Sequence, residues 1–297
     1  MQMTDPPVDL EVVIVSHGAE GLLRRCLESL RGHPPRTTAT MRVTVVDSGS
    51  PDGTPDMVER EFPEFHLERR ANIGFSAANN LVLRESRAGA VLLLNPDTEV
   101  YAGTLDTCLA RLGADPAIGM VGAKLVQEDG ELDHAAKRSF PTPLAALAHF
   151  TGIGRGTGAG ASLSQYRATH LGEDEAGEVD AVNGAFMLCR AEAVAQVGLL
   201  DEGYWLYMED LDWCHRFWDA GWKVFYEPGA GALHVKGGSS ARRRAPKQEI
   251  AFHRGMGRFY RRFDAPSANP LLNLAVYVGI GAKLAVSLAI TALHGRD

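Results

Sequence analysis

The chain has 297 residues, of which 45% are hydrophobic and 23% are charged. These are the proportions of a soluble globular protein with one large domain, or with one domain and an appendage. The formal net charge of −7 argues against a general nucleic-acid binder, so we expect no nucleic-acid partner. The four cysteines form no CxxC pair, which predicts reduced thiols of a cytosolic protein and argues against a structural zinc site.

Short apolar runs alternate with segments of helical periodicity over the first 125 residues. The predicted strands are residues 11–16, 41–47, 65–69, 90–94 and 120–125, and the predicted helices are residues 18–30, 54–61, 76–85 and 104–112. This alternation predicts an α/β fold with a doubly wound, mostly parallel sheet. In such sheets, ligands bind beyond the carboxyl ends of the strands.

The alternation stops between residues 126 and 179, which we expect to shape an acceptor site although no motif there names the acceptor. Residues 151–160 are rich in glycine and predict a mobile loop. They are not a dinucleotide-binding fingerprint, because no strand precedes them and no helix follows. Further elements are predicted at residues 185–190 (strand), 209–220 (helix), and 222–226 and 231–235 (short strands).

Three strands place a polar side chain at the same edge of the predicted sheet: Ser16, Asp47 and Asp97. Asp97 follows a proline that ends its strand, so its carboxylate can hold a divalent cation against a diphosphate. The alternative is a turn aspartate that caps the next helix. Asp47 can accept the imide N–H of a uracil or thymine ring, and its alternative is an Asx-turn.

Glu209 and Asp210 lie at the start of a predicted helix, after an aromatic run that includes Trp205 and Tyr207. Asp210 there can act as a general base toward an acceptor hydroxyl, and Trp205 suits a sugar platform. The alternatives are helix capping by the acids and core packing by the aromatic rings. His234 follows an apolar strand, where it is a candidate metal ligand or a hydrogen-bonded structural histidine.

Taken together and in this order, the motifs resemble those of the family 2 glycosyltransferases with a GT-A fold, in particular the bacterial rhamnosyltransferase-like branch. The matching segments are VVIVS (12–16), VDSGSPDGT (46–54), NIGFSAANN (72–80), LNPD (94–97), NGAFM (183–187), EDLD (209–212) and GWKV (221–224), followed by His234. They span about residues 11 to 240. The resemblance implies a catalytic domain over residues 9–240, followed by a helical C-terminal segment over residues 241–297.

The resemblance also implies a role for each matching residue. Ser16, Asp47 and the turn from Asn72 to Gly74 would bind the base and ribose of a dTDP- or UDP-linked sugar. Asp97 and His234 would hold Mg²⁺ or Mn²⁺ against the diphosphate. Asp210 would be the base, and Glu209 would either support it or bind the acceptor. Asn183 and Gly184 would line the donor-sugar pocket. Asn95 replaces the first aspartate of the usual Asp-x-Asp motif, which removes one charge from the metal site.

The activity implied is inverting transfer of a sugar, with a leaning toward L-rhamnose from dTDP-rhamnose, to a hydroxyl of a glycan or a lipid-linked acceptor of the cell envelope. The alternatives are a transferase that uses another UDP- or dTDP-sugar, and a non-catalytic module that binds nucleotide sugars or glycans. A nucleotidyltransferase would need a glycine-rich basic loop after the first strand, where this chain has SHGAE (16–20).

The C-terminal segment combines a basic block with an apolar stretch. Eight basic residues and one acidic residue lie between positions 242 and 262, and residues 271–293 are mostly apolar. Lys283 argues against a membrane span, at about 3 kcal/mol on insertion scales. We therefore expect a cytoplasmic protein bound peripherally to the inner face of the cell membrane. The alternatives are a homodimer interface and packing on the catalytic domain.

Overall fold

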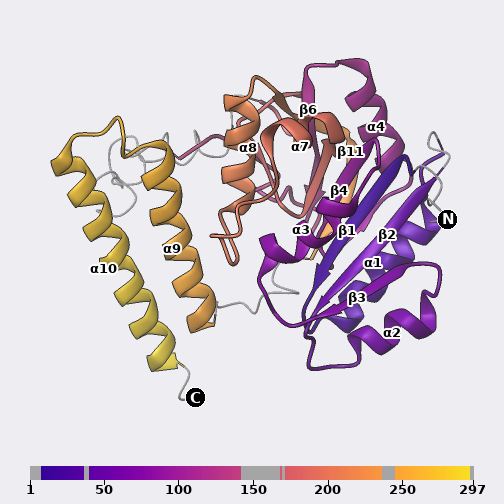
Figure 1. The fold of residues 1–297 in the computed structure, drawn as a ribbon, viewed down its shortest axis with the longest axis horizontal. Coiled ribbons are helices and arrows are strands. Elements are labelled where there is room, and N and C mark those ends of the chain that lie inside the picture. The colour runs from indigo at the N-terminus through magenta and orange to yellow at the C-terminus, as the bar shows by residue number, and fades with distance from the viewer. Residues whose placement is uncertain (1–7, 37–39, 142–167, 169–170, 236–244, 295–297) are drawn as a thin grey trace, which may run out of the picture.

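The structure is a computed structural model, and it describes residues 8–36, 40–141, 168, 171–235 and 245–294. Its centre is one large sheet with the strand order β3-β2-β1-β4-β10-β6-β11-β5 (Figure 1). The predicted loop at residues 151–160 and the arginines at 242–244 lie outside the described residues. The mixed α/β architecture with a mostly parallel sheet confirms the predicted fold class.

The first half of the sheet is entirely parallel. Its strands are β1 (Leu10–Ser16), β2 (Met41–Ser48), β3 (His66–Arg70) and β4 (Ala90–Leu94), joined by the helices α1 (Glu20–Gly32), α2 (Thr54–Glu61) and α3 (Phe75–Glu85). The strands β1 and β4 are fully or almost fully buried along their apolar runs, because helices cover a parallel sheet on both faces. The carboxyl ends of these strands therefore share one edge of the sheet.

The second half of the sheet is mixed. Its strands are β5 (Thr98–Val100), β6 (Ile118–Val126), β8 (Gly177–Glu178), β10 (Phe186–Arg190) and β11 (Lys223–His234), and its helices are α4 (Thr104–Ala114), α7 (Ala191–Val197) and α8 (Glu209–Asp219). A separate small sheet pairs β7 (Lys137–Arg138) with β9 (Ala181–Val182). Strand β10 runs antiparallel between β4 and β6.

One prediction about these elements was wrong. The two short strands expected at residues 222–226 and 231–235 form the single strand β11, whose pairing with β6 is interrupted between Glu227 and Gly231. Pro228 lies in this interruption, where it has no N–H to donate to the ladder. The sequence pattern also missed β5, β7, β8, β9 and α7, which are too short to show a hydrophobic period.

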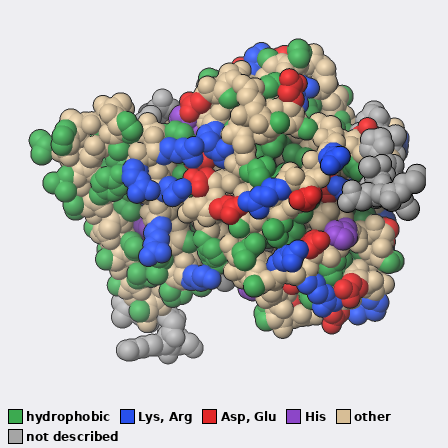
Figure 2. Space-filling model, in the orientation of Figure 1, with side chains coloured by type: hydrophobic (Ala, Val, Ile, Leu, Met, Phe, Trp, Pro, Cys, Tyr) green, Lys and Arg blue, Asp and Glu red, His purple; other side chains and the backbone are tan. Residues whose placement is uncertain are grey.

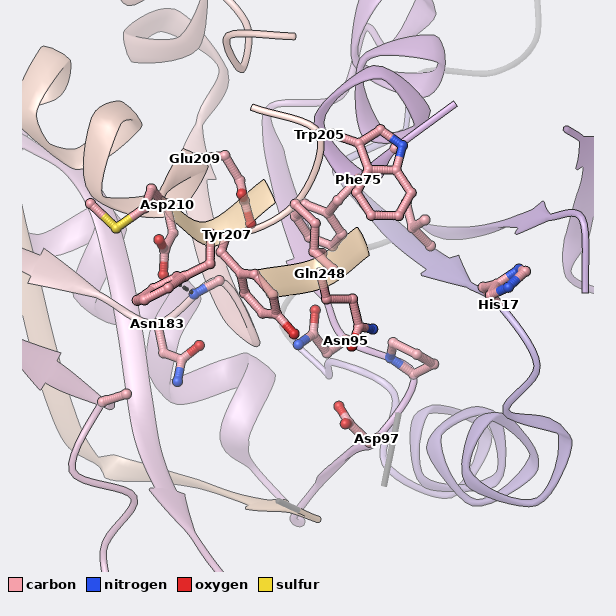
Figure 3. A pocket seen from close by; sticks show the side chains of 18 of the residues that line it. His17, Phe75, Asn95, Asp97, Asn183, Trp205, Tyr207, Glu209, Asp210 and Gln248 are labelled. Carbon is pink, nitrogen blue, oxygen red and sulfur yellow. Dashed lines mark hydrogen bonds between the residues drawn. The ribbon is translucent and has the colours of Figure 1, made fainter. Parts of the chain in front are cut away.

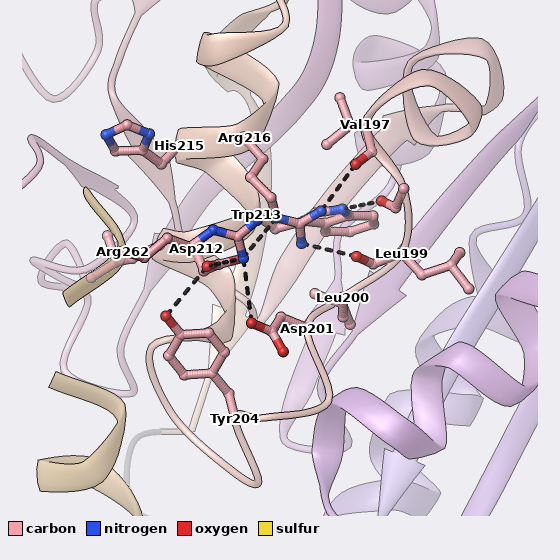
Figure 4. A network of polar contacts seen from close by, with 12 residues as sticks. Val197, Leu199, Leu200, Asp201, Tyr204, Asp212, Trp213, His215, Arg216 and Arg262 are labelled. Carbon is pink, nitrogen blue, oxygen red and sulfur yellow. Dashed lines mark hydrogen bonds and ion pairs between the residues drawn. The ribbon is translucent and has the colours of Figure 1, made fainter. Parts of the chain in front are cut away.

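The C-terminal segment forms two long helices, α9 (Pro246–Phe263) and α10 (Pro270–His294), which stand side by side at one end of the molecule (Figure 1). Helix α9 docks on the α/β part of the chain through two acids, the partly buried Asp201 and the fully buried Asp212. Arg258 binds Asp201 through two hydrogen bonds of 2.9 Å, and Arg262 Nη1 lies 3.0 Å from Asp212 Oδ1 (Figure 4). Helix α10 packs on α9 around Tyr260.

Candidate functional site

A pocket of about 1020 Å³ opens at the carboxyl ends of the parallel strands (Figure 3). All of the predicted site residues except Asp47 line it. They are Ser16, Asn72, Gly74, Asn95, Asp97, Asn183, Gly184, Trp205, Glu209, Asp210 and His234. These residues come from positions more than 200 apart in the sequence, so the fold collects them from almost the whole catalytic part of the chain.

Asp47 lies beside the pocket rather than on its wall. Asp47 on β2 is the register partner of Ser16 on β1, so the two residues lie next to each other near the ends of neighbouring strands. Asp47 Oδ2 accepts a hydrogen bond of 3.1 Å from the backbone N–H of Ser50, three residues further along the turn. Asp47 Oδ1 and Ser16 Oγ are both buried and have no hydrogen-bond partner among the described residues. The turn contact therefore leaves one oxygen of the Asp47 carboxylate buried and without a hydrogen-bond partner among the described residues.

The turn before α3 requires glycine. Gly74 has φ 94° and ψ 163°, a region that is essentially closed to other residues. A Cβ atom there would lie 2.5 Å from Trp205 Cδ1 and 2.7 Å from the Trp205 carbonyl oxygen. The following residue, Phe75, donates its backbone N–H to that carbonyl at 2.8 Å. The turn and the Trp205 loop are therefore fitted closely to each other at the pocket wall.

Asp97 and His234 face each other because β5 and β11 pair antiparallel, with His234 opposite Thr98. His234 Nε2 lies 3.6 Å from Asp97 Oδ1, and His234 Nδ1 lies 2.8 Å from Asp133 Oδ2. Burial alone would lower the pKa of His234, but the hydrogen bonds and negative charges of Asp133 and Asp97 outweigh it and raise that pKa to about 9.

The donor set of Asp97 and His234 fits one divalent ion. Ligand atoms about 2.1 Å from a shared ion lie about 3 to 4 Å apart, and the observed 3.6 Å is within that range. In the described part of the chain, no group of three or more His, Cys, Asp or Glu residues is arranged to hold a metal. Two protein ligands are nevertheless common for Mg²⁺, because substrate phosphates and water complete its shell.

The acid pair begins α8, directly after two residues in strained backbone conformations. Tyr207 (φ 70°) and Met208 (φ 73°) are both left-handed, which is rare for residues other than glycine. Asp210 Oδ2 accepts hydrogen bonds from Arg138 Nη2 at 2.6 Å and from the backbone N–H of Gly184 at 3.2 Å. The carboxylate is therefore held from two sides at the pocket wall.

Glu209 is buried next to Asp210, and Glu209 Oε2 has no hydrogen-bond partner among the described residues. Burial raises the pKa of Glu209, and the negative charge of Asp210 raises it further, to about 8. Burial and the neighbouring carboxylate therefore favour the protonated form of Glu209, and Arg138 Nη2 contacts the Asp210 carboxylate at 2.6 Å.

A series of contacts connects the Asp97–His234 pair to the Glu209–Asp210 pair. Asp133 contacts His234, and Asn183 Nδ2 lies 3.5 Å from Asp133 Oδ2, at the limit of a hydrogen bond. The next residue, Gly184, donates its backbone N–H to Asp210. The segment from Asn183 to Gly184 therefore lies between the Asp97–His234 pair and the Glu209–Asp210 pair.

Sequence reasoning missed several residues of the pocket. Asp133 and Arg138 lie within residues 126–179, where no pattern marked them. The C-terminal helices also reach the pocket, which we did not expect: α9 contributes Gln248, Glu249 and Phe252, and α10 contributes Ser287, Ile290 and Thr291. The sequence showed only the basic character of the α9 segment and the length and apolar character of the α10 segment.

Comparisons with known proteins agree with this geometry. The chain matches the model of glycosyl transferase family 2 over residues 11–193. It is 30% identical over 256 residues to the N-acetylglucosaminyl-diphospho-decaprenol L-rhamnosyltransferase of Mycobacterium tuberculosis, covering 82% of this chain and 81% of that protein. It is 24% identical to the rhamnosyltransferase WbbL of Escherichia coli, covering 75% of this chain and 82% of that protein.

Among solved structures, the chain is similar to the mannosyltransferase PcManGT from Pyrobaculum calidifontis in complex with GDP-Man and Mn²⁺. The TM-score is 0.58 at 17% sequence identity, covering 97% of this chain and 76% of that chain, so this likeness concerns the fold. The resemblance stated from the motifs is thereby confirmed, and the chain belongs to glycosyl transferase family 2.

Proposed function

We propose that this chain is an inverting, metal-assisted glycosyltransferase that moves a sugar from a dTDP- or UDP-linked donor to an acceptor hydroxyl. The observation that carries the proposal is that one pocket holds both the Asp97–His234 pair and the Asp210 carboxylate. The Asp97–His234 pair is suited to bind a diphosphate through its cation. The Asp210 carboxylate is suited to accept a proton from a hydroxyl group. The two are connected through Asp133 and the Asn183–Gly184 segment.

Each residue then has one task. Asp97 and His234 would hold Mg²⁺ or Mn²⁺, which when bound neutralises charge on the leaving nucleoside diphosphate. Asp210 accepts the proton of the acceptor hydroxyl as its oxygen attacks the anomeric carbon. The glycosidic bond forms on the face opposite the bond that breaks, so the configuration inverts in one displacement. Glu209 holds its own proton and supports Asp210.

The donor sugar we favour is L-rhamnose from dTDP-rhamnose. The mycobacterial and Escherichia coli relatives are both named rhamnosyltransferases, which supports this choice. The name of the mycobacterial relative also supports a lipid-linked acceptor. The unpartnered Asp47 Oδ1, close to Ser16, suits the imide N–H of thymine or uracil.

Turnover of nucleotide sugars by the full-length protein tests the proposal. With Mn²⁺ and dTDP-rhamnose, we expect slow release of dTDP without acceptor and faster release with a lipid-linked glycan. NMR of the product should show an anomeric configuration opposite to that of the donor. A non-catalytic binding module would raise its melting temperature with the donor but release no nucleoside diphosphate. Retention of configuration would contradict the single displacement.

We further propose that α10 lies on the inner face of the cell membrane. It is the one helix in the described part of the chain that is long and apolar enough to cross a bilayer, and by itself this is weak support. Most of its exposed residues form one uncharged face. They are Leu271, Leu274, Ala275, Val278, Gly281, Ala282, Ala285, Val286 and Ala289. Lys283 is only partly exposed and lies on another side of the helix, so a helix lying in the interface can keep it away from the lipid.

The basic residues of α9 support the same placement of α10 on the membrane. Figure 2 shows basic side chains over α9, beside the apolar side chains of α10. Arg254 and Arg261 are exposed there, and each basic residue near an anionic leaflet contributes about 1 kcal/mol. Arg258 and Arg262 are engaged with Asp201 and Asp212, so fewer arginines are available than the basic block alone indicated.

Vesicle sedimentation tests the membrane proposal. The full-length protein should sediment with phosphatidylglycerol-containing vesicles at low salt, and the double substitution Leu274→Ser with Val278→Ser should reduce partitioning by at least ~10-fold. Tyr101→Ser, at an exposed aromatic residue of the catalytic part, is the matched control. If the wild type stays off vesicles, and truncation after Phe263 turns a dimer into a monomer, α10 is a protein interface instead.

A further inference from the structure

Asp133 is a buried carboxylate that no sequence motif marks. Its side chain is 1% exposed, and its Oδ2 lies 2.8 Å from His234 Nδ1. The opposite ring nitrogen, His234 Nε2, is the one that faces Asp97. Asp133 therefore contacts the edge of the imidazole that points away from the proposed metal position.

The carboxylate of Asp133 is itself fixed in place. Asp133 Oδ1 accepts a hydrogen bond of 3.0 Å from the backbone N–H of Ala135, so each of its two oxygens has a contact. The backbone N–H of Asp133 donates to the Leu125 carbonyl at 2.8 Å, at the end of β6. The backbone N–H of Ala136 donates to the Asp133 carbonyl at 2.8 Å, which closes a turn. The turn anchors the acid to the same sheet that carries His234.

We propose that Asp133 is a positioning residue: it accepts the Nδ1–H of His234 and so holds Nε2 toward the ion shared with Asp97. This inference rests on the metal site of the proposed function. An ionised carboxylate is only an acceptor, so its contact makes Nδ1 the donor and leaves Nε2 to bind the metal. Carboxylates placed in this way on metal-binding histidines typically change metal affinity 10- to 100-fold when removed.

Asp133 is not placed to be a third ligand of the same ion. The two nitrogens of an imidazole point away from each other, and Asp133 is bonded to the nitrogen opposite Asp97. In the described ranges, no set of three or more His, Cys, Asp or Glu residues is arranged around one metal position. Asp133 therefore acts on the ion through His234 alone.

Binding of Mn²⁺ by the full-length protein in the presence of UDP, and separately of dTDP, tests the inference by electron paramagnetic resonance. Asp133→Ala should weaken Mn²⁺ binding 10- to 100-fold. Asp133→Asn keeps a carbonyl acceptor for Nδ1–H and should recover part of the loss. Glu131→Gln, two residues away and exposed, is the matched control and should bind as the wild type does.

A double-mutant cycle separates positioning from a general effect on the fold. If Asp133 acts through His234, adding Asp133→Ala to His234→Ala should cause no further loss of Mn²⁺ affinity. If Asp133→Ala fails to fold, Asp133→Asn takes its place in the same double-mutant cycle with His234→Ala. Wild-type affinity in a folded Asp133→Ala variant, or full additivity with His234→Ala, overturns the inference and leaves the metal site standing. If the wild type itself binds no Mn²⁺, the metal site fails and the inference fails with it.

Discussion

Arg138 joins the proposed catalytic base to the small sheet of β7 and β9. Its Nη2 donates to Asp210 Oδ2 and to the carbonyl oxygen of Val182, both at 2.6 Å. The side chains of Arg138 and Asp210 are 8% and 14% exposed, so water screens the pair weakly. The guanidinium of Arg138 therefore compensates the negative charge of Asp210.

Replacing Arg138 should therefore lower both the stability of the fold and kcat. Arg138→Met removes the charge but keeps most of the apolar stem, and removing one partner of a buried ion pair typically destabilises by about 3–5 kcal/mol. We expect kcat to fall at least ~10-fold in steady-state kinetics, with a smaller change in donor KM, because Asp210 loses its orientation. Arg138→Lys should recover part of the loss. Arg69→Met, which removes surface ion pairs with Asp56 and Glu59, is the control.

Removing the base itself should separate binding from chemistry. Asp210→Asn keeps the size of the side chain and an oxygen for the N–H of Gly184. Donor affinity, measured by calorimetry, should stay within a few-fold of the wild type, while turnover falls by at least ~100-fold. Near-normal turnover in this variant would remove Asp210 from the mechanism.

The raised pKa of Glu209 predicts how stability depends on pH. The ordinary pKa of a glutamate is 4.5 and the pKa of Glu209 in the folded chain is about 8, so between these two pH values the folded chain holds a proton that the unfolded chain has released. Stability contributed by this residue therefore falls as pH rises from about 4.5 to about 8, and is constant above that range. Glu209→Gln should remove this dependence, so its melting temperature should exceed that of the wild type by more at pH 8 than at pH 5.

The expected difference for Glu209→Gln is at least about 2 °C, which corresponds to about 1 kcal/mol for a domain of this size. Glu131→Gln changes the same chemical group on an exposed side chain and should leave the pH profile of unfolding as it is in the wild type. A profile that is identical in Glu209→Gln and the wild type would show that the glutamate is ionised in the folded protein at neutral pH.

Much of the parallel half of the fold was predictable, because its strands are continuous apolar runs that end at recognisable turns. The strand Ala90–Leu94 and the helix Thr54–Glu61 were predicted with the bounds that the structure gives. The motif residues could be assigned to one edge of the sheet for the same reason. Family resemblance then supplied roles for residues such as Asn183 that no local pattern explains.

The rest depends on contacts between distant segments. Asp133 and Arg138 are 101 and 72 positions from their partners His234 and Asp210, and two-residue strands such as β7 carry no period that a sequence can show. The packing of α9 on the catalytic part likewise depends on Asp201 and its distant arginine partners. The helix or strand propensity of a single segment does not indicate which distant residue its side chains will contact.

Metal dependence can be measured at Asp97. Asp97→Ala should weaken both Mn²⁺ binding and donor binding, because the carboxylate would hold the ion that bridges protein and diphosphate. Excess EDTA should reproduce the loss of turnover in the wild type, and added Mg²⁺ or Mn²⁺ should restore it. Asp129→Ala, at an exposed acid of the β6–β7 connection, is the control. Full activity in EDTA would point to a metal-free form of the mechanism.

Gly74 tests whether the turn before α3 shapes the donor site. Gly74→Ala places a Cβ atom 2.5 Å from the Trp205 ring at a φ of 94°, so the backbone or the Trp205 loop must move. The backbone strain alone costs about 1–3 kcal/mol. We expect a lower melting temperature and at least ~10-fold weaker binding of UDP and dTDP by calorimetry. Gly113→Ala, inside helix α4 with no atom within 4 Å of the new Cβ, should be neutral or stabilising. Unchanged nucleotide affinity in Gly74→Ala would exclude this turn from the donor site.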